Sequence, residues 1–245
     1  MTKEKLTTMT TLTKATKIEP TSKIRPTPRA EDTRRKIYDA ALELFREKGF
    51  EQTTMRDIAA KAQVALGGAY YYFPSKDAIV LDFYRYTQES SHEVILEDLA
   101  KHRTLKDRIR CVLEKRLELL HPNRKFCAAL FRHAPDSADP LSPFSEASRP
   151  IREHAVEHMR LAMEGGDVKV PSDLKPRLPY LLWLYQMGLM LFWVYDKSAR
   201  QARTALLFEK TLSMVLLLIK LASVPLLRPL LRPAGELLKA LYGEV

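Results

Sequence analysis

The sequence predicts an all-α protein in which an N-terminal three-helix, helix-turn-helix domain precedes a larger helical domain. From Thr33 onward apolar residues recur at spacings of three and four, which favours helices over strands. Thr54, Ser75 and Thr104 each stand where the N-cap of a helix is expected. Two short helical patterns flank a tight turn at 63–65, behind a longer supporting helix, and this is the helix-turn-helix arrangement.

Composition limits the class of protein and its partners. The chain has 245 residues, of which 46% are hydrophobic, so a sizeable core is available. Forty Lys and Arg against thirty Asp and Glu give a net charge of +10. Such an excess indicates a polyanionic partner, either nucleic acid or an anionic membrane face, although a merely basic soluble surface remains an alternative.

The cysteines and the N-terminus indicate a cytoplasmic location. Cys111 and Cys127 are too few for a disulfide framework, which fits a reducing compartment. No apolar leader stands at the start. Residues 1–30 are rich in Thr, Lys and Pro, and we expect a disordered basic tail there. A DNA-binding arm and a plain solvated tail are both compatible with that composition.

The first predicted helix begins near Thr33. Its apolar face is formed by Ile37, Ala41, Leu44 and Phe45. Gly49 ends the helix as a left-handed C-terminal residue would.

A second, short helix is predicted from Met55 to Ala62. Thr54 and Asp57 have the spacing of a capping box, in which each residue's side chain accepts from the other's backbone amide. The turn at 63–65 then leads into the segment LGGAYYYF, residues 66–73.

The segment 66–73 predicts a third helix with two different faces. The helical period places Leu66, Ala69, Tyr70 and Phe73 on an inward side, and Gly68, Tyr71 and Tyr72 on an outward face with Gly67 beside them. Each glycine within a helix costs about 1 kcal/mol relative to alanine. Two on an outward face indicate the close approach of another surface, where tyrosine hydroxyls could donate to phosphates. The alternative is a helix end loosened by glycine, with tyrosines covering a small core.

The next helix is capped by Ser75 and begins at Lys76. Lys76 would then project from a helix N-terminus, where its ammonium and the backbone amides together suit a phosphate.

The stretch TTMRDIAAKAQVALGGAYYYFPSKDAIV, residues 53–80, resembles the DNA-binding segment of TetR-family transcriptional repressors, and the resemblance extends from about Arg34 to Ile79. It implies that the third helix enters the major groove of a double-stranded DNA operator. It also implies that a larger helical domain binds a small-molecule effector and forms a homodimer. The implied division is 31–80 for DNA binding, 81–224 for ligand binding and dimerisation, and 225–245 for a tail.

The resemblance implies a role for individual residues. Arg56 matches a position that often reaches a base edge, although a salt bridge is its alternative role. Ala65 stands where Ser or Thr commonly caps the third helix, and Gly68 replaces a small, usually polar residue, so readout of the base sequence has fewer polar groups. The implied DNA contacts are Thr54, Arg56, Gly67, Gly68, Tyr70, Tyr71, Tyr72 and Lys76.

In the larger domain, the sequence predicts several long helices and one long loop. Helices are expected at 77–101, 105–120, 151–164, 178–196 and 199–223, with a loop over 135–150 and a tail without assigned role from 225. The last two helices are apolar on more than one face, which indicates a self-complementary dimer interface. A membrane hairpin over 178–224 is the alternative, but Gln186, Glu209 and Lys220 interrupt it, so we expect no membrane partner.

The effector pocket is the least determined feature. Aromatic and soft side chains with a few polar groups are typical of small-ligand sites, although most such residues serve as ordinary core. His154 and His158 could bind a metal from one helix face, but without a third ligand a solvated face is the expected role. The candidate lining residues are Phe126, Phe131, His133, Trp183, Met187 and Trp193.

Catalytic patterns do not occur in the sequence. It contains no Gly-rich phosphate loop, nucleophile elbow or metal-binding cysteine cluster, and Cys111 and Cys127 are expected as buried small residues rather than a redox pair. We therefore expect no enzyme activity, no cofactor and no metal. The resemblance implies instead a ligand-responsive repressor that binds a palindromic operator as a homodimer and is released by its effector.

Overall fold

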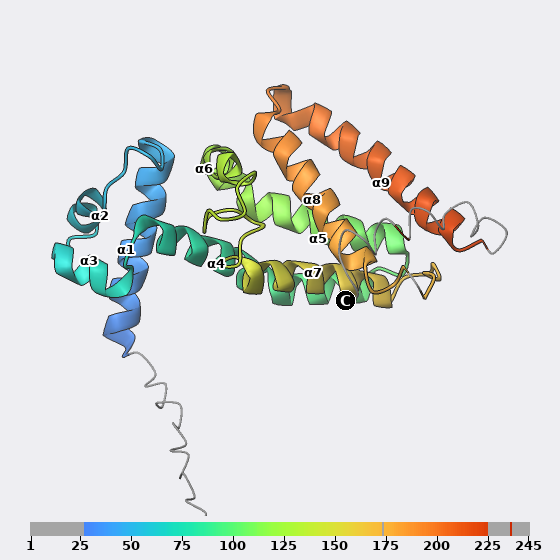
Figure 1. Cartoon of the computed structure of the whole chain (residues 1–245), viewed down its shortest axis with the longest axis horizontal. Coiled ribbons are helices and arrows are strands. Elements are labelled where there is room, and N and C mark those ends of the chain that lie inside the picture. The colour runs from blue at the N-terminus through green and yellow to red at the C-terminus, as the bar shows by residue number, and fades with distance from the viewer. Residues whose placement is uncertain (1–26, 173, 225–235, 237–245) are drawn as a thin grey trace, which may run out of the picture.

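The computed structural model describes residues 27–172, 174–224 and 236, and the regular elements within them are all helices (Figure 1). In chain order these are α1 (Pro28–Glu47), α2 (Met55–Lys61), α3 (Leu66–Tyr72), α4 (Lys76–Lys101), α5 (Leu105–Leu120), η1 (His121–Asn123), α6 (Arg124–Leu130), η2 (Phe131–His133), α7 (Arg149–Glu164), α8 (Leu178–Tyr195), η3 (Ala199–Gln201) and α9 (Ala202–Ala222).

The first helix starts earlier than its apolar pattern does. Thr27 caps α1, its Oγ1 accepting from the amide of Ala30, and Pro28 occupies the first turn, where a missing N–H costs nothing. The predicted tail boundary at residue 30 is therefore wrong by three residues, because polar residues supply the first turn. Residues 1–26 and most of the tail from 225 lie outside the described residues. Gly49, with φ +87°, ends the helix as predicted.

The second and third helices form the predicted helix-turn-helix. In the capping box of α2 the Asp57 amide donates to Thr54 Oγ1 over 3.1 Å, and the Thr54 amide donates to Asp57 Oδ2 over 3.0 Å. Gln63 makes the turn with a positive φ of 56°. At the start of α3, Ala65 offers no side-chain cap. The two helices pack on one another and on α1.

Helix α4 joins the two parts of the molecule. Ser75 caps it as predicted, since its Oγ accepts from the amide of Ala78. The helix runs from the domain formed by α1, α2 and α3, called the head below, into the larger domain, where it packs against α5 and α7 (Figure 1). Helix α8 lies on α7, and α9 lies on α5 and α8.

A helix that the sequence pattern did not predict, α6, lies between the head and the larger domain. Phe126 of α6 stacks on Phe45 of α1 at 5.0 Å between ring centroids, and its ring meets Phe83 of α4 edge-on at 5.3 Å. All three residues are buried in one core cluster that runs from the head into the larger domain. The head is therefore held by shared core packing as well as by α4.

Helix α8 is the one described helix whose length and composition match a membrane span, and 44% of that stretch is buried inside the protein. Helix α9, the second half of the hairpin considered above, does not meet the same criterion within the described residues.

Candidate DNA-binding surface and ligand pocket

The tyrosines of α3 divide differently from the prediction. Tyr71 is 83% exposed and Tyr70 is 48% exposed, whereas Tyr72 is partly buried and packs against the core. Leu66 is also exposed. The prediction that Leu66 and Tyr70 point inward is therefore wrong, and so is the prediction that Tyr72 points outward. The reason is that α3 is only seven residues long. Ala69 and Phe73, both buried, therefore suffice to fix it.

The two glycines of α3 border open space. A Cβ added to Gly67 or Gly68 would meet no atom of the chain within 4 Å. Packing inside the protein therefore does not require glycine at either position. The fold does not explain why two residues of low helix propensity stand in this helix.

Arg56 and Thr54 lie on the exposed side of α2. Arg56 takes part in no ion pair or hydrogen bond among the residues that the structure describes, so the alternative of a structural salt bridge is not observed. Thr54 is exposed, but its hydroxyl also donates to Asp57 Oδ2 over 2.8 Å. The Thr54 side chain is thus already engaged in capping α2.

Lys76 does not project freely from the start of α4. Its Nζ donates to the carbonyl oxygen of Phe50 over 2.8 Å and lies 4.5 Å from the centre of the Phe50 ring. The expectation of an ammonium directed at a phosphate needs this correction. Lys76 holds the loop after α1 against α4, at a carbonyl that also accepts from the backbone amide of Thr53 over 3.3 Å.

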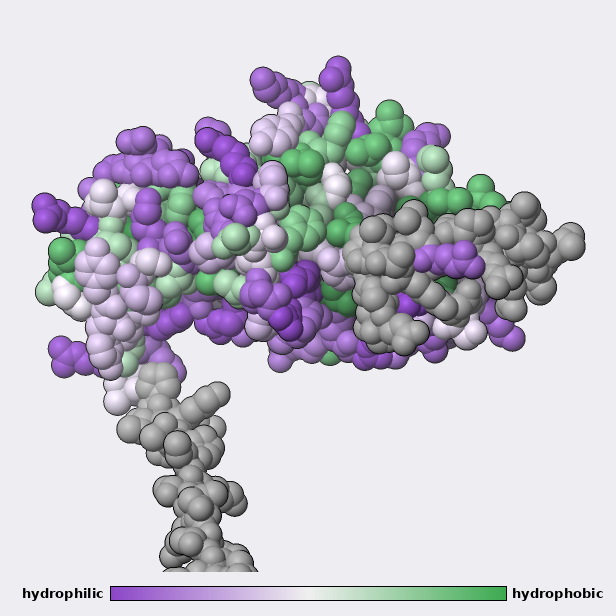
Figure 2. Space-filling view, in the orientation of Figure 1, coloured by the Kyte–Doolittle hydropathy of each residue, from purple (hydrophilic) through white to green (hydrophobic). Residues whose placement is uncertain are grey.

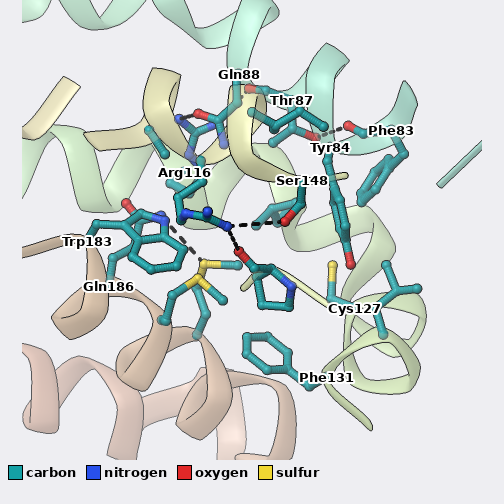
Figure 3. A pocket seen from close by; sticks show the side chains of 18 residues that line it. Phe83, Tyr84, Thr87, Gln88, Arg116, Cys127, Phe131, Ser148, Trp183 and Gln186 are labelled. Carbon is teal, nitrogen blue, oxygen red and sulfur yellow. Dashed lines mark hydrogen bonds between the residues drawn. The ribbon is translucent and has the colours of Figure 1, made fainter. Parts of the chain in front are cut away.

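The larger domain contains a mostly apolar cavity of about 90 Å³ (Figure 3). Side chains from α4, α5, α6, α7, α8 and the loop before α7 line it. Phe131, Trp183 and Met187, all predicted, are among them. Figure 3 shows Gln88 and Arg116 on one side of the cavity and Phe131 on the opposite side. The other lining residues include Phe83, Tyr84, Thr87, Cys127, Ser148, Arg152, Gln186 and Met190.

Three predicted pocket residues lie elsewhere. Phe126 is in the core between the head and the larger domain, as described above. His133 Nδ1 lies 2.6 Å from Asp139 Oδ2, and the His133 ring packs edge-on against Phe50. Trp193 is buried near the end of α8, where Arg124 donates to its carbonyl oxygen. Aromatic character identified Phe126 and Trp193 as buried, but it could not distinguish core from cavity.

Arg116 is a charged pocket residue that the prediction missed. Its side chain is 1% exposed, and Nη1 donates to the Thr87 carbonyl over 2.7 Å while Nη2 donates to Gln88 Oε1. The sequence did carry a signal for it. Residues 109, 113, 116 and 120 form the apolar face of α5, and position 116 is the one charged residue in that row.

His158 is buried, so the expectation of a solvated helix face is wrong for it. Its Nδ1 lies 3.3 Å from Arg116 Nη2 and its Nε2 lies 2.9 Å from His92 Nδ1. Burial, with the nearby charge of Arg116, lowers the pKa of His158 to about 4. His154 stays exposed. In the part of the chain that the structure describes, no three His, Cys, Asp or Glu side chains gather as metal ligands.

Both cysteines are buried free thiols. Cys127 lines the cavity, and burial raises its pKa to about 12. It therefore behaves as a small apolar residue at neutral pH.

A row of large apolar side chains is exposed on α8 and α9. Figure 2 shows hydrophobic residues gathered over these two helices. Leu206, Met214 and Leu218 of α9 are each at least 60% exposed. Leu191, Phe192 and Tyr195 of α8 and Leu217 and Leu221 of α9 are exposed as well.

The fold and these sites define a helix-turn-helix DNA-binding protein whose second helical domain encloses a cavity. The chain belongs to the TetR family of bacterial regulatory proteins. Residues 37–83 match the family of that description, and residues 108–237, more than half of the chain, match the tetracyclin repressor-like C-terminal domain.

Curated relatives are similar over part of their length. The fatty acid metabolism regulator protein of Bacillus subtilis is 33% identical over 85 residues, which are 35% of this chain and 44% of that protein. The HTH-type transcriptional regulator RutR of Escherichia coli is 32% identical over 118 residues, 46% of this chain and 56% of that protein. The chain thus spans about half the length of these relatives.

Solved structures share the fold. A TetR-family regulator from Syntrophomonas wolfei superposes with a TM-score of 0.58 at 23% identity, covering 75% of this chain and 93% of that one. The regulator FadR from Bacillus subtilis, in complex with stearoyl-CoA, superposes with a TM-score of 0.59 at 21% identity, covering 74% and 96%. FadR from Thermus thermophilus, in complex with lauroyl-CoA, gives 0.54 at 23% identity, covering 73% and 92%.

Proposed function

We propose that this chain is a homodimeric transcriptional repressor that binds a palindromic operator through α3 and is released when a small effector occupies the cavity. The observation that carries the proposal is the outer side of α3. There, two glycines border open space beside Tyr71, the most exposed large hydrophobic side chain among the described residues of the head. A duplex in close contact would account for both features.

The proposed DNA contacts come from both short helices. Arg56 is free to reach a base edge, where a guanidinium can bond guanine bidentately. Tyr70 and Tyr71 are exposed to donate to backbone phosphates, and Gly67 and Gly68 let the helix approach closely. Thr54 lies beside this surface. Lys76 acts chiefly by fixing the loop after α1, and Tyr72 by packing.

The proposed dimer uses the apolar face of α8 and α9. A contiguous face of this kind is unusual on a monomer and suits a two-fold interface made by the same helices of a second copy. Two reading helices related in this way would meet half-sites about 34–36 Å apart, one turn of the duplex.

The proposed coupling runs through α6. Successive residues of this helix face two sites, since Phe126 packs on Phe45 of α1 while Cys127 lines the cavity. A ligand that displaces α6 or α4 would shift the head, because both helices share its core. The half-site spacing would then no longer fit, and affinity for the operator would fall.

The experiment places a side chain on the outer surface of α3. Gly68→Leu should raise the free energy of unfolding by about 0.5–1 kcal/mol, because leucine is the better helix former and meets no atom of the chain. The same change should weaken binding to a mixed-sequence duplex by at least about tenfold, since the added bulk separates α3 from the groove. Urea unfolding and fluorescence anisotropy give the two values.

Ser90→Leu is the matched control, because it places the same leucine side chain at an exposed position of α4. It should leave DNA binding unchanged. If Gly68→Leu binds DNA as wild type does, α3 does not lie against the duplex.

A further inference from the structure

The charged groups around the cavity are all of one sign. Among its lining residues are two arginines, Arg116 and Arg152, and no Asp or Glu. Arg152 Nη1 donates to the carbonyl oxygen of Pro143 over 2.7 Å and to that of Ser145 over 3.1 Å. The cavity therefore has two guanidinium groups at its wall without a carboxylate to balance them.

Arg116 is satisfied only in part, and only by neutral groups. Its terminal nitrogens contact a backbone carbonyl, the Gln88 amide oxygen and the imidazole of His158, which is uncharged at neutral pH. Its Nε is buried and has no hydrogen-bond partner among the residues that the structure describes. Burial alone lowers the pKa of Arg116 to about 10, so the group still carries its charge. A buried charge without an ionic partner is costly in a folded protein.

Two other arginines of α5 do not share this state. Arg110 is paired with Glu209. Arg108 uses Nε, Nη1 and Nη2 on backbone carbonyls of helix ends and does not line the cavity. Arg116 thus combines deep burial, an unused donor and a position at the cavity wall.

Resting on the proposed ligand-responsive function, we propose that the effector is a small organic anion, with a carboxylate that pairs with Arg116 and an apolar body against Trp183 and Phe131. A carboxylate supplies the acceptor that Arg116 Nε lacks and the opposite charge that its surroundings lack. Arg152, at the same wall, adds to the positive potential.

The dimensions of the cavity favour a small ligand. At about 90 Å³ it is smaller than the ~150 Å³ cavity that holds benzene in an engineered protein. Met187 and Met190, both in the wall, are unbranched and can repack around a longer chain. A coenzyme A thioester fits the charge pattern less well. Its acyl part is uncharged, and its phosphates are too bulky for this space.

The test measures binding by calorimetry on the full chain without DNA, so that it can fail while DNA binding holds. The probes are straight-chain carboxylates from butyrate to decanoate, the matched primary alcohols, and octanoyl-CoA. We expect the best carboxylate to bind at least about tenfold more tightly than its alcohol and than octanoyl-CoA, as charge pairing in a dry site requires.

Arg116→Met keeps an unbranched, flexible side chain and removes the charged guanidinium. It should abolish the preference for carboxylate over alcohol. Arg108→Met, which removes a guanidinium outside the cavity, should retain that preference. Should the Arg116 variant fail to fold, the relative affinities of the wild-type chain for carboxylate, alcohol and thioester still decide whether the cavity prefers an anion.

Three results would overturn the proposal. They are the absence of binding by every carboxylate at millimolar concentration, equal affinity for acid and alcohol, and an undiminished preference in Arg116→Met. Tighter binding of octanoyl-CoA than of octanoate would assign the cavity to the thioester instead.

Discussion

Arg56 is a charged residue of the head that no other described residue engages. It is exposed on α2, and no ion pair or hydrogen bond holds it among the described residues. Lys61 and Lys48, by contrast, are paired with carboxylates. The free guanidinium of Arg56, beside α3, is available to bond to a base edge, whereas the paired lysines stabilise the head.

Replacing Arg56 by alanine should therefore separate binding from stability. Loss of one bidentate base contact weakens binding to a selected operator by about tenfold or more. The free energy of unfolding should stay within about 0.5 kcal/mol of wild type, as for other exposed side chains without partners. Arg103→Ala, at an exposed position between α4 and α5, makes the same change in charge and should bind DNA normally. Equal effects of the two variants would assign Arg56 only a general electrostatic role.

His158 should make stability depend on pH. Its pKa is about 4 in the folded protein and ordinarily about 6.5, so on acidification the unfolded chain takes up the proton first. Stability is thus fully present above about pH 6.5 and is lost as pH falls towards 4. Between about pH 7 and pH 5 the loss amounts to about 2 kcal/mol at most.

His158→Gln removes the titrating group and keeps a hydrogen-bonding side chain. Urea unfolding at the two pH values should show a smaller loss in the variant than in wild type. Parallel losses would mean that the imidazole is not the source of the pH dependence.

At the scale of elements, the helix ends were predictable because their chemistry is local. Thr54, Ser75 and Thr104 each accept from an amide three residues further on, and Gly49 acts through its own positive φ, so the sequence contains the whole interaction. Helix α6 was missed because it lacks such a local signal: Asn123, which precedes it, makes no side-chain cap. Its position depends on distant contacts such as Phe126 with Phe45.

The cavity could be predicted much less well than the reading helix. Its wall combines five helices and a loop, so neighbours such as Arg116 and Gln88 are 28 residues apart in sequence. Phe131, Trp183 and Met187 were chosen by type alone, and so were Phe126 and Trp193, which belong to the core. Only tertiary packing separates the two groups.

The oligomeric state should change when a single charge is placed on the apolar face of α8 and α9. Leu218 is 62% exposed in the isolated chain, and we expect it to be buried in the dimer. Leu218→Glu would bury an unpaired carboxylate there and shift the protein to monomer at micromolar concentration. Sedimentation velocity measures the change.

Leu96→Glu on α4 is the control, because Leu96 is exposed but lies outside that face. It should sediment as wild type does. A Leu218→Glu protein that remains a dimer would place the interface elsewhere.

At the scale of the whole molecule, the head and the cavity are not independent units. One core cluster extends from α1, α2 and α3 through Phe126 to Trp193 at the end of α8. The aromatic contacts between Phe45, Phe126 and Phe83 leave no flexible linker between the two sites. A change of packing around the cavity is therefore expected to alter the position of α3.

The most direct measurement is selection of bound fragments from a pool of random duplex DNA. A two-fold pair of α3 helices predicts enriched sequences that are palindromic, with half-sites centred one helical turn, about 10–10.5 base pairs, or a multiple of it, apart. Enrichment of single, unrepeated sites, or of no sequence at all, would contradict the account of a dimer that reads DNA through α3.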